Sequence, residues 1–136
     1  GKGTMITECV KTLPEKTSFI VKHQQILISV SDSSLAFIIE EHMSKIFNLI
    51  VKHRISVNMM QNSAVSFSLC IDYDKYTIPG FISDLQFNFK VYYNKNLSLY
   101  TIRNYTKITA NNFMKGKKIL LEQRSRNTLQ FVVAEN

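Results

Sequence analysis

Hydrophobic and polar residues follow two different periods along this chain, and each change of period marks the boundary of an expected element. Residues 26–31 (ILISVS) form an apolar run that is typical of a strand. Asp32, Ser33 and Ser34 follow it, and their side-chain oxygens can accept the free N–H groups of a first helical turn. Beyond them the apolar side chains recur at helical spacing, which predicts an amphipathic helix whose apolar stripe contains Ile39, Met43, Ile46, Phe47 and Ile50.

The predicted helix leaves through residues 52–54 (KHR) into two runs typical of strands, 56–63 and 64–72. In the second run Val65, Phe67, Leu69 and Ile71 alternate with small residues, so one face of the sheet is expected to be apolar. Pro79 suits the first turn of a second helix that begins near residue 78. Residues 89–95 then predict a fourth strand. The region has the order β-α-β-β-α-β.

The chain on either side of this region predicts a second set of elements. Residues 18–31 are expected to form two strands, or one long bent strand with its break near 23–25. Residues 94–96 are expected to turn the chain into a separate strand at 97–105. A short helix at 107–114 would end at Gly116, and residues 118–125 and 128–136 would form a hairpin.

Together these elements predict an α+β fold of two small units, each with an antiparallel sheet and its helices on one face. The first unit would comprise residues 26–95 and would be inserted into the second, which would combine residues 4–25 with 96–136. The opening GKGTMITE has no initiator methionine, and this suggests a fragment of a longer protein.

The composition is that of a globular protein, with 45% hydrophobic and 20% charged residues in a chain of 136. Neither a run of about 20 apolar residues nor a charged-then-apolar leader occurs, so we expect a cytoplasmic protein without a membrane partner. The two cysteines, Cys9 and Cys70, lie far apart and lack metal-ligand spacing. We expect two reduced thiols and no metal site.

The net charge of +7 raises the question of nucleic acid, because basic surfaces attract phosphate. The cationic residues are scattered, however, and a solvated loop explains the one denser patch at Lys115, Lys117 and Lys118. An RNA-recognition module shares the β-α-β-β-α-β order but needs stacking aromatic rings on its third strand, where this chain offers only Phe67 on the apolar side. We expect no nucleic-acid partner and keep RNA binding as the less favoured alternative.

Motifs of catalysis are absent from the sequence. It contains no Gly-rich phosphate loop and no H-E-x-x-H run, and His23, His42 and His53 have no evident acid or nucleophile partner. The adjacent Glu40 and Glu41 would diverge by about 100° on a helix and could not converge on one substrate atom. We therefore expect a binding region with no catalytic residue and no cofactor of its own.

Three stretches carry a family resemblance: GTMIT near the start, KIFNLIVKHRISVNMMQNSAVSFSLCID at 45–72, and KILLEQRSRNTLQFVV at 118–133. They resemble the C-terminal regulatory region of aspartate kinase, a pair of ferredoxin-like ACT units. The middle stretch is similar to the family pattern of a helix that ends in a residue-His pair, an I-S-V segment, a Ser and a V-S-hydrophobic-S strand. This middle pattern is fairly specific. The two outer stretches are weak alone and support the resemblance mainly because they occur in the expected order along the chain. The resemblance also implies that the first ACT unit is inserted into the second.

What the resemblance implies is a non-catalytic region that senses an end-product amino acid, lysine or threonine, for feedback inhibition. It implies a homodimer formed through the ACT units. The kinase domain of the same chain would be the further partner, and ATP and magnesium would belong to that domain, which is absent here. The alternative is an ACT pair that serves only subunit assembly.

In the family the effector pocket lies between the first strand–helix turn and the start of the second strand. Backbone N–H groups at a helix start suit an α-carboxylate, and amide side chains with strand-edge carbonyls suit an ammonium. Carried over by position, the resemblance implies a pocket formed by Ser31, Asp32, Ser33, Ser34, Phe37, Ile39, Val57, Asn58, Met59, Met60, Gln61, Asn62 and Ser63.

The sequence departs from the family pattern at positions that bear on the ligand. Asn58 and Ala64 stand where the family often has acids, and residues 41–43 (EHM) replace the Gly-Phe-Leu of lysine-sensing members. Charge-assisted hydrogen bonds are about twice as strong as neutral ones, so the loss of two carboxylates weakens the hold on a side-chain ammonium. A smaller ligand, or none, is consistent with this pocket.

Overall fold

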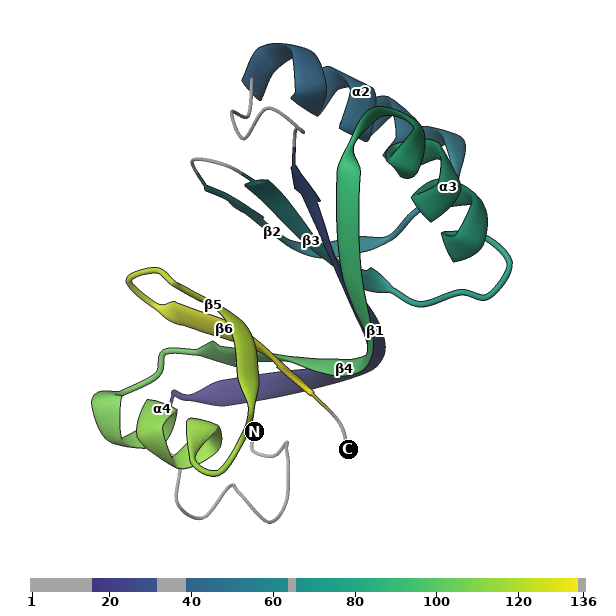
Figure 1. The fold of residues 1–136 in the computed structure, drawn as a ribbon. Helices are drawn as coiled ribbons and strands as arrows, with labels where there is room; N and C mark the ends of the chain where they lie inside the picture. Colours follow the sequence, from purple (N-terminus) through teal and green to yellow (C-terminus); the bar gives the residue numbers. More distant parts are fainter. Residues whose placement is uncertain (1–15, 32–38, 64–65, 135–136) are drawn as a thin grey trace. The chain divides into compact units, whose positions relative to one another are not determined.

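The computed structural model describes residues 16–31, 39–63 and 66–134. This part of the chain contains strands and helices, and the strands follow the order β2-β3-β1-β4-β6-β5 in the sheet (Figure 1). The pairs β1–β3, β2–β3 and β5–β6 are antiparallel. The elements are β1 (Ser18–Ser31), α2 (Ile39–Lys52), β2 (Val57–Asn62), β3 (Ser66–Asp72), α3 (Ile78–Asn88), β4 (Lys90–Arg103), α4 (Lys107–Met114), β5 (Ile119–Arg124) and β6 (Thr128–Ala134). The predicted α+β class is confirmed.

The chain divides into two compact units, one of which is Gln24–Leu97 and the other the chain on both sides of it. We call the continuous unit the inserted unit and the other the outer unit. The strands β1 and β4 each contribute residues to both units.

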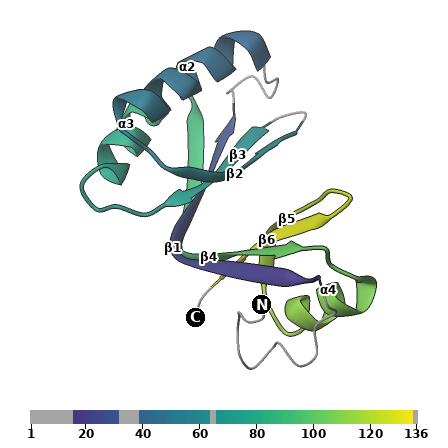
Figure 2. The ribbon, with the colours of Figure 1, turned by 180° about the vertical axis from the view of Figure 1, so that it is seen from behind.

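The core of the inserted unit lies between its sheet and the helices α2 and α3, which cover the same face (Figures 1 and 2). Alternate residues of β1 and β3 face this core in register, since Ile28 lies opposite Leu69 and Val30 opposite Phe67. Each such side chain stabilises the fold by about 1.5–3 kcal/mol when fully buried. The helix α3 adds four buried side chains at helical spacing, Ile78, Phe81, Ile82 and Leu85.

The outer unit has its own core beneath α4. The ring of Tyr100 on β4 stacks on that of Phe131 on β6, with centroids 5.0 Å apart. Thr106 begins α4 as its N-cap, and its hydroxyl accepts a hydrogen bond from the N–H of Thr109 at 3.1 Å. Gly116 follows the helix with φ of 73°, a left-handed conformation that glycine adopts at little cost. The predicted helix and hairpin of this unit are confirmed.

One expected boundary was wrong. Residues 94–96 do not turn the chain into a new strand, because β4 is a single strand from Lys90 to Arg103. Asn96 has φ of 59°, a left-handed conformation that asparagine tolerates, and it bends the strand without ending it. Asparagine is also common in turns, which is why the sequence around this bend resembles a turn. β1 is likewise one strand with a left-handed residue, Gln24 (φ 56°), which confirms the single bent strand among the two alternatives.

Candidate functional site

The implied effector pocket lies partly outside the described residues, since Asp32, Ser33, Ser34 and Phe37 belong to the undescribed segment 32–38. Ile39 is the first residue of α2. The described part consists of Ser31 at the end of β1 and residues 57–63 on and after β2.

Strand pairing brings Ser31 and the end of β2 to the same end of the sheet in the inserted unit, and we call this end of the sheet the Ser31 edge. Ser31 lies opposite Ser66 of β3, and Asn62 lies opposite Phe67, so both flank the start of β3. The N–H of Ser63 donates to the carbonyl of Ser66 at 2.9 Å, and the two hydroxyl oxygens are 3.0 Å apart. This edge therefore presents hydroxyl and amide groups, which can hydrogen-bond either charged end of an amino acid.

A β-bulge separates Asn58 from that edge. The register shifts between Val57, which pairs with Ile71, and Met59, which pairs with Cys70. A bulge sets two residues opposite one and re-aims a side chain. Asn58 is directed to the face that carries Gln25, where the two residues form a hydrogen bond.

The amide of Asn58 is engaged inside the protein. Its Nδ2 donates to Oε1 of Gln25 and to Oδ1 of Asp72, both at 2.8 Å. Gln25 is only 1% exposed, and its Nε2 donates to the same Asp72 oxygen at 2.8 Å. The buried thiol of Cys70 donates to Gln25 at 3.3 Å. These four residues form one connected set, which we call the Asn58 network.

The Asn58 network lies at the far end of β3 from Ser31. Ser31 is opposite Ser66, whereas the bulge faces Cys70 and Ile71, which is about 13–17 Å further along at roughly 3.3 Å per residue. Val57 packs against the core and Met59 is buried, while Met60 is 41% exposed. The structure thus brings Ser31 together with residues 61–63 and holds Asn58 apart. A role for Asn58 in the pocket stays a prediction.

Sequence reasoning missed Gln25 and Asp72. A signal was present, since Gln25 is a polar residue that directly precedes the apolar run 26–30 and a buried amide needs a partner. That partner lies 47 positions away, opposite Gln25 in the β1–β3 register. Pairing over that separation is set by the sheet and not by local sequence.

The end of α2 is tied to α3 through Asp84. One carboxylate oxygen of Asp84 lies 2.7 Å from Nε2 of His53 and 3.1 Å from Nζ of Lys52. The hydrogen bond with His53, followed by the one from Lys52, lowers the pKa of Asp84 below its ordinary value. The residue-His pair of the family pattern therefore stabilises the packing of the two helices in this chain.

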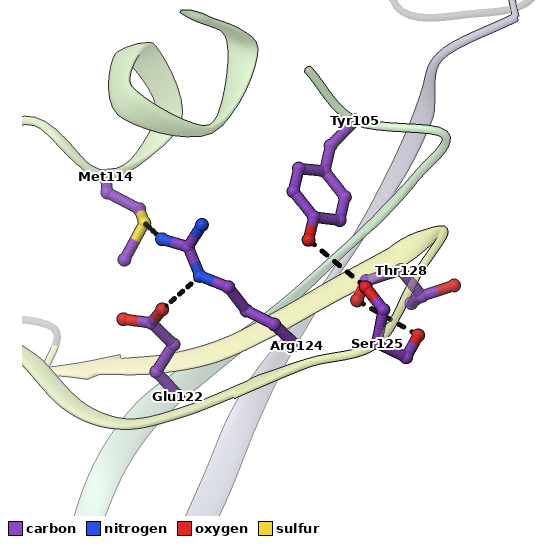
Figure 3. Close-up of polar contacts among 6 residues, drawn as sticks. All are labelled: Tyr105, Met114, Glu122, Arg124, Ser125 and Thr128. Carbon is purple, nitrogen blue, oxygen red and sulfur yellow. Dashed lines mark hydrogen bonds and ion pairs between the residues drawn. The ribbon is translucent and has the colours of Figure 1, made fainter. Parts of the chain in front are cut away.

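The outer unit holds its polar side chains around the β5–β6 hairpin (Figure 3). Arg124 donates to Glu122, contacts the sulfur of Met114 and lies 6.0 Å from the ring centroid of Tyr105. The Glu122 carboxylate raises the pKa of Arg124. The hydroxyl of Tyr105 donates to the carbonyl of Ser125 at 3.1 Å. These contacts pair the groups with one another, so their role is structural.

Two further observations concern residues 16–31, 39–63 and 66–134. No group of three or more His, Cys, Asp and Glu side chains in these segments is placed to hold a metal ion. No helix among them is long and apolar enough to cross a membrane.

Comparison with known proteins finds similar solved structures but no similar sequence family. No protein-family model matches the sequence, and no curated protein matches it. A chain described as a C-terminal regulatory domain of aspartate kinase from Porphyromonas gingivalis W83 is similar with a TM-score of 0.73 at 23% identity, over 87% of this chain and 86% of that one. The regulatory subunit of aspartate kinase from Thermus flavus has a TM-score of 0.65 at 9% identity, over 85% and 86%. The fold is that of aspartate kinase regulatory regions.

The likeness extends to a whole aspartate kinase. Escherichia coli aspartokinase III, in complex with lysine and aspartate in its T-state, has a TM-score of 0.69 at 16% identity and matches 90% of this chain. The match covers only 31% of the kinase chain. The resemblance to the ACT pair of aspartate kinase, inferred from the sequence, is confirmed at the level of the fold.

In the inserted unit β3 gives no stacking platform for RNA. Phe67 is 2% exposed and packs in the core beneath the helices, as its alternation predicts. The opposite face of β3 carries Ser66, Ser68, Cys70 and Asp72, none of them aromatic. RNA recognition through β3 therefore lacks its main requirement.

Proposed function

We propose that this chain is the regulatory part of an aspartate kinase, that it binds an end-product amino acid, and that it pairs with a second copy of itself. The observation that carries the proposal is the likeness over nearly the full length of both ACT units to a chain described as such a regulatory domain. The E. coli aspartokinase with the same fold was solved with lysine, an amino-acid ligand. The catalytic step, with ATP and magnesium, would belong to a separate kinase domain.

The proposed binding site is the end of the sheet that carries Ser31 on one side of β3 and Gln61, Asn62 and Ser63 on the other. Ser31 is the last residue of β1, and α2 begins eight positions later at Ile39. A helix N-terminus favours the α-carboxylate of an amino acid. Strand-edge carbonyls and the amides of Gln61 and Asn62 would take the α-ammonium.

The composition of this site favours threonine over lysine. Of the residues that the resemblance assigns to it, only Asp32 is acidic. A bound lysine would bring two ammonium groups, whereas threonine brings one ammonium and a hydroxyl that serine and amide side chains can pair. We therefore propose threonine or a similarly small amino acid as the effector.

Pairing with a second copy is supported by the position of β2. It is the first strand in the order of the described sheet, so no strand among the described residues lies along one of its edges. Exposed strand edges are sites at which another strand can add. Met60 on this strand is 41% exposed and would be covered by such a contact.

Calorimetric titration of the 136-residue chain with threonine, lysine and methionine tests the proposal, together with sedimentation to determine the oligomeric state. We expect a dimer that binds threonine most tightly, and a double variant Gln61→Ala/Ser63→Ala that binds it much more weakly. Ser125→Ala is the matched control, because it removes a hydroxyl group from the outer unit. It should bind threonine with the affinity of the parent. A stable dimer that binds no amino acid would instead support a role in assembly alone.

A further inference from the structure

A second polar hollow lies beside the middle of β1, away from the proposed amino-acid site at the end of that strand. Its volume is about 600 Å³, and it is lined by Gln24, Gln25, Tyr73, Lys75, Lys95 and Asn96. All six residues belong to the inserted unit. Gln25 and Ser31 are six positions apart on one strand, which corresponds to about 20 Å at roughly 3.3 Å per residue. We call this hollow the two-lysine hollow.

The charge of the two-lysine hollow is positive. Lys75 and Lys95 contribute ammonium groups, and no acidic residue lines it. Among the described residues, no carboxylate forms an ion pair with either lysine. Gln24, Asn96 and Tyr73 have amide and phenol side chains, which can donate hydrogen bonds to an anion. Gln25 is held in the Asn58 network.

The acids closest in sequence are directed elsewhere. Asp72 accepts hydrogen bonds from Gln25 and Asn58 within the Asn58 network. Asp74 accepts a hydrogen bond from the N–H of Tyr76 at 2.8 Å, within its own loop. Neither carboxylate lines the hollow, so its positive charge is left for a ligand.

The two lysines are supported by aromatic rings. The ammonium of Lys95 lies 5.3 Å from the centroid of the Tyr73 ring, and that of Lys75 lies 5.3 Å from the ring of Tyr76. A cation over an aromatic face is attracted by about 0.5–1 kcal/mol at an exposed site. Tyr73 lines the hollow, so the contact of Lys95 with its ring favours a position of that ammonium beside the hollow. Tyr76 lies outside the lining.

The backbone around the hollow is constrained. Gln24 and Asn96, with φ of 56° and 59°, are two of four non-glycine residues with positive φ in the described part of the chain. The N–H of Tyr73 donates to the carbonyl of Gln24 at 2.9 Å and fixes this corner. Gln24 and Asn96 mark the bends of β1 and β4, so fixed backbone lies on two sides of the hollow.

From these observations we infer that the two-lysine hollow binds a small dianion, either a dicarboxylate or a phosphate-bearing metabolite. Lysine acts as a point charge for such groups, and two ammoniums on one hollow complement two negative charges. An α-amino acid effector differs from this ligand because the lysines would repel its ammonium. The inference does not depend on the proposed amino-acid site.

The test is a titration of the 136-residue chain, followed by amide NMR, with inorganic phosphate in one arm and succinate in the other. We expect signals of residues 73–75 and 95–96 to move in at least one arm, which also identifies the preferred anion. Lys75→Gln and Lys95→Gln should each weaken binding roughly tenfold, as loss of one charge-assisted contact implies.

Lys117→Gln is the matched control, because Lys117 also lies over a tyrosine ring, 5.4 Å from the centroid of Tyr100, but in the outer unit. It should leave the affinity unchanged within about twofold. The inference would be overturned if neither anion bound at about 10 mM, or if all three variants weakened binding equally, which would indicate a general charge effect.

Discussion

His53 and Asp84 lie 2.7 Å apart and join the end of α2 to the middle of α3. Lys52 reaches the same carboxylate oxygen but is 65% exposed, whereas the side chain of His53 is 18% exposed. The histidine is the stronger of the two contacts, because solvent screens exposed ion pairs.

This contact predicts a pH dependence of stability. The pKa of Asp84 is lowered in the folded protein, chiefly by its hydrogen bond with His53. A lowered pKa stabilises the fold above the unfolded-state value of about 3.9, and the stabilisation is lost as the pH falls through the folded value. Asp84→Asn should therefore melt below the parent at neutral pH and match it at strongly acidic pH. A constant difference in Tm at every pH would contradict this origin, and Lys52→Gln should have a smaller effect.

Gly80 provides the space for the His53 ring. A methyl group at this position would lie 3.2 Å from Cε1 of His53. The ring is held by Asp84 and by an edge contact with Phe81, so it has little room to shift. Replacing helical glycine by alanine ordinarily stabilises by up to about 1 kcal/mol. Urea unfolding should show no gain in the free energy of unfolding for Gly80→Ala. In the His53→Ala background, where the ring is removed, Gly80→Ala should raise the free energy of unfolding.

The Asn58 network predicts that Asn58 matters for stability. Asn58→Ala would leave acceptors on Gln25 and Asp72 without this donor, at a cost of about 1–3 kcal/mol. Asn62→Ala, at an exposed position of the same strand, should stay within about 0.5 kcal/mol. Chemical unfolding of the two variants measures the difference. Equal stabilities would show that the network contributes nothing measurable.

Asn58→Asp provides a sharper version of the same test. Aspartate cannot donate when it is ionised, and its carboxylate would stand next to that of Asp72. We expect this variant to be less stable than Asn58→Ala at neutral pH and to recover in acid, where one carboxyl of the pair is protonated. Thermal melting at several pH values would measure this. A variant as stable as the parent at neutral pH would indicate that the Asn58 network tolerates the acid common in the family.

We expect the loss of the Arg124 side chain to reduce the stability of the outer unit only slightly. Its contacts with Glu122, Met114 and Tyr105 are largely exposed (Figure 3). Arg124→Ala should destabilise by about 0.5–1 kcal/mol and less at high salt. A loss above about 3 kcal/mol would show that the hairpin depends on this residue far more than its exposure implies.

The elements with a clear local period could be predicted from the sequence. The stripe of α2 and the alternation of β3 reflect burial against one core, and Ile46 and Phe67 are buried as expected. The prediction was wrong for Phe47, which is 40% exposed because it follows Ile46 directly and points about 100° away from it around the helix. The course of β4 could not be predicted, because Asn96 has the local composition of a turn while its strand neighbours keep the chain extended.

The candidate site was only partly predictable for a similar reason. Ser31 and residues 61–63 lie at the same end of the sheet because β3 pairs with both strands that carry them, an arrangement that the β-α-β-β order implies. The bulge after Val57 directs Asn58 to Gln25 and Asp72, and no local signal gives a shift of register. The remaining residues, 32–34 and 37, lie outside the described part of the chain.

The central claim is that an amino acid binds at the edge formed by Ser31 and residues 61–63. A threonine titration followed by amide NMR tests it most directly, since each residue reports separately. We predict saturable shifts at residues 31 and 61–63, none at residues 75 and 95, and a stabilisation of about 2.7 kcal/mol at 100 times the dissociation constant. Unchanged signals at residues 31 and 61–63 with threonine, lysine and methionine alike would contradict the claim.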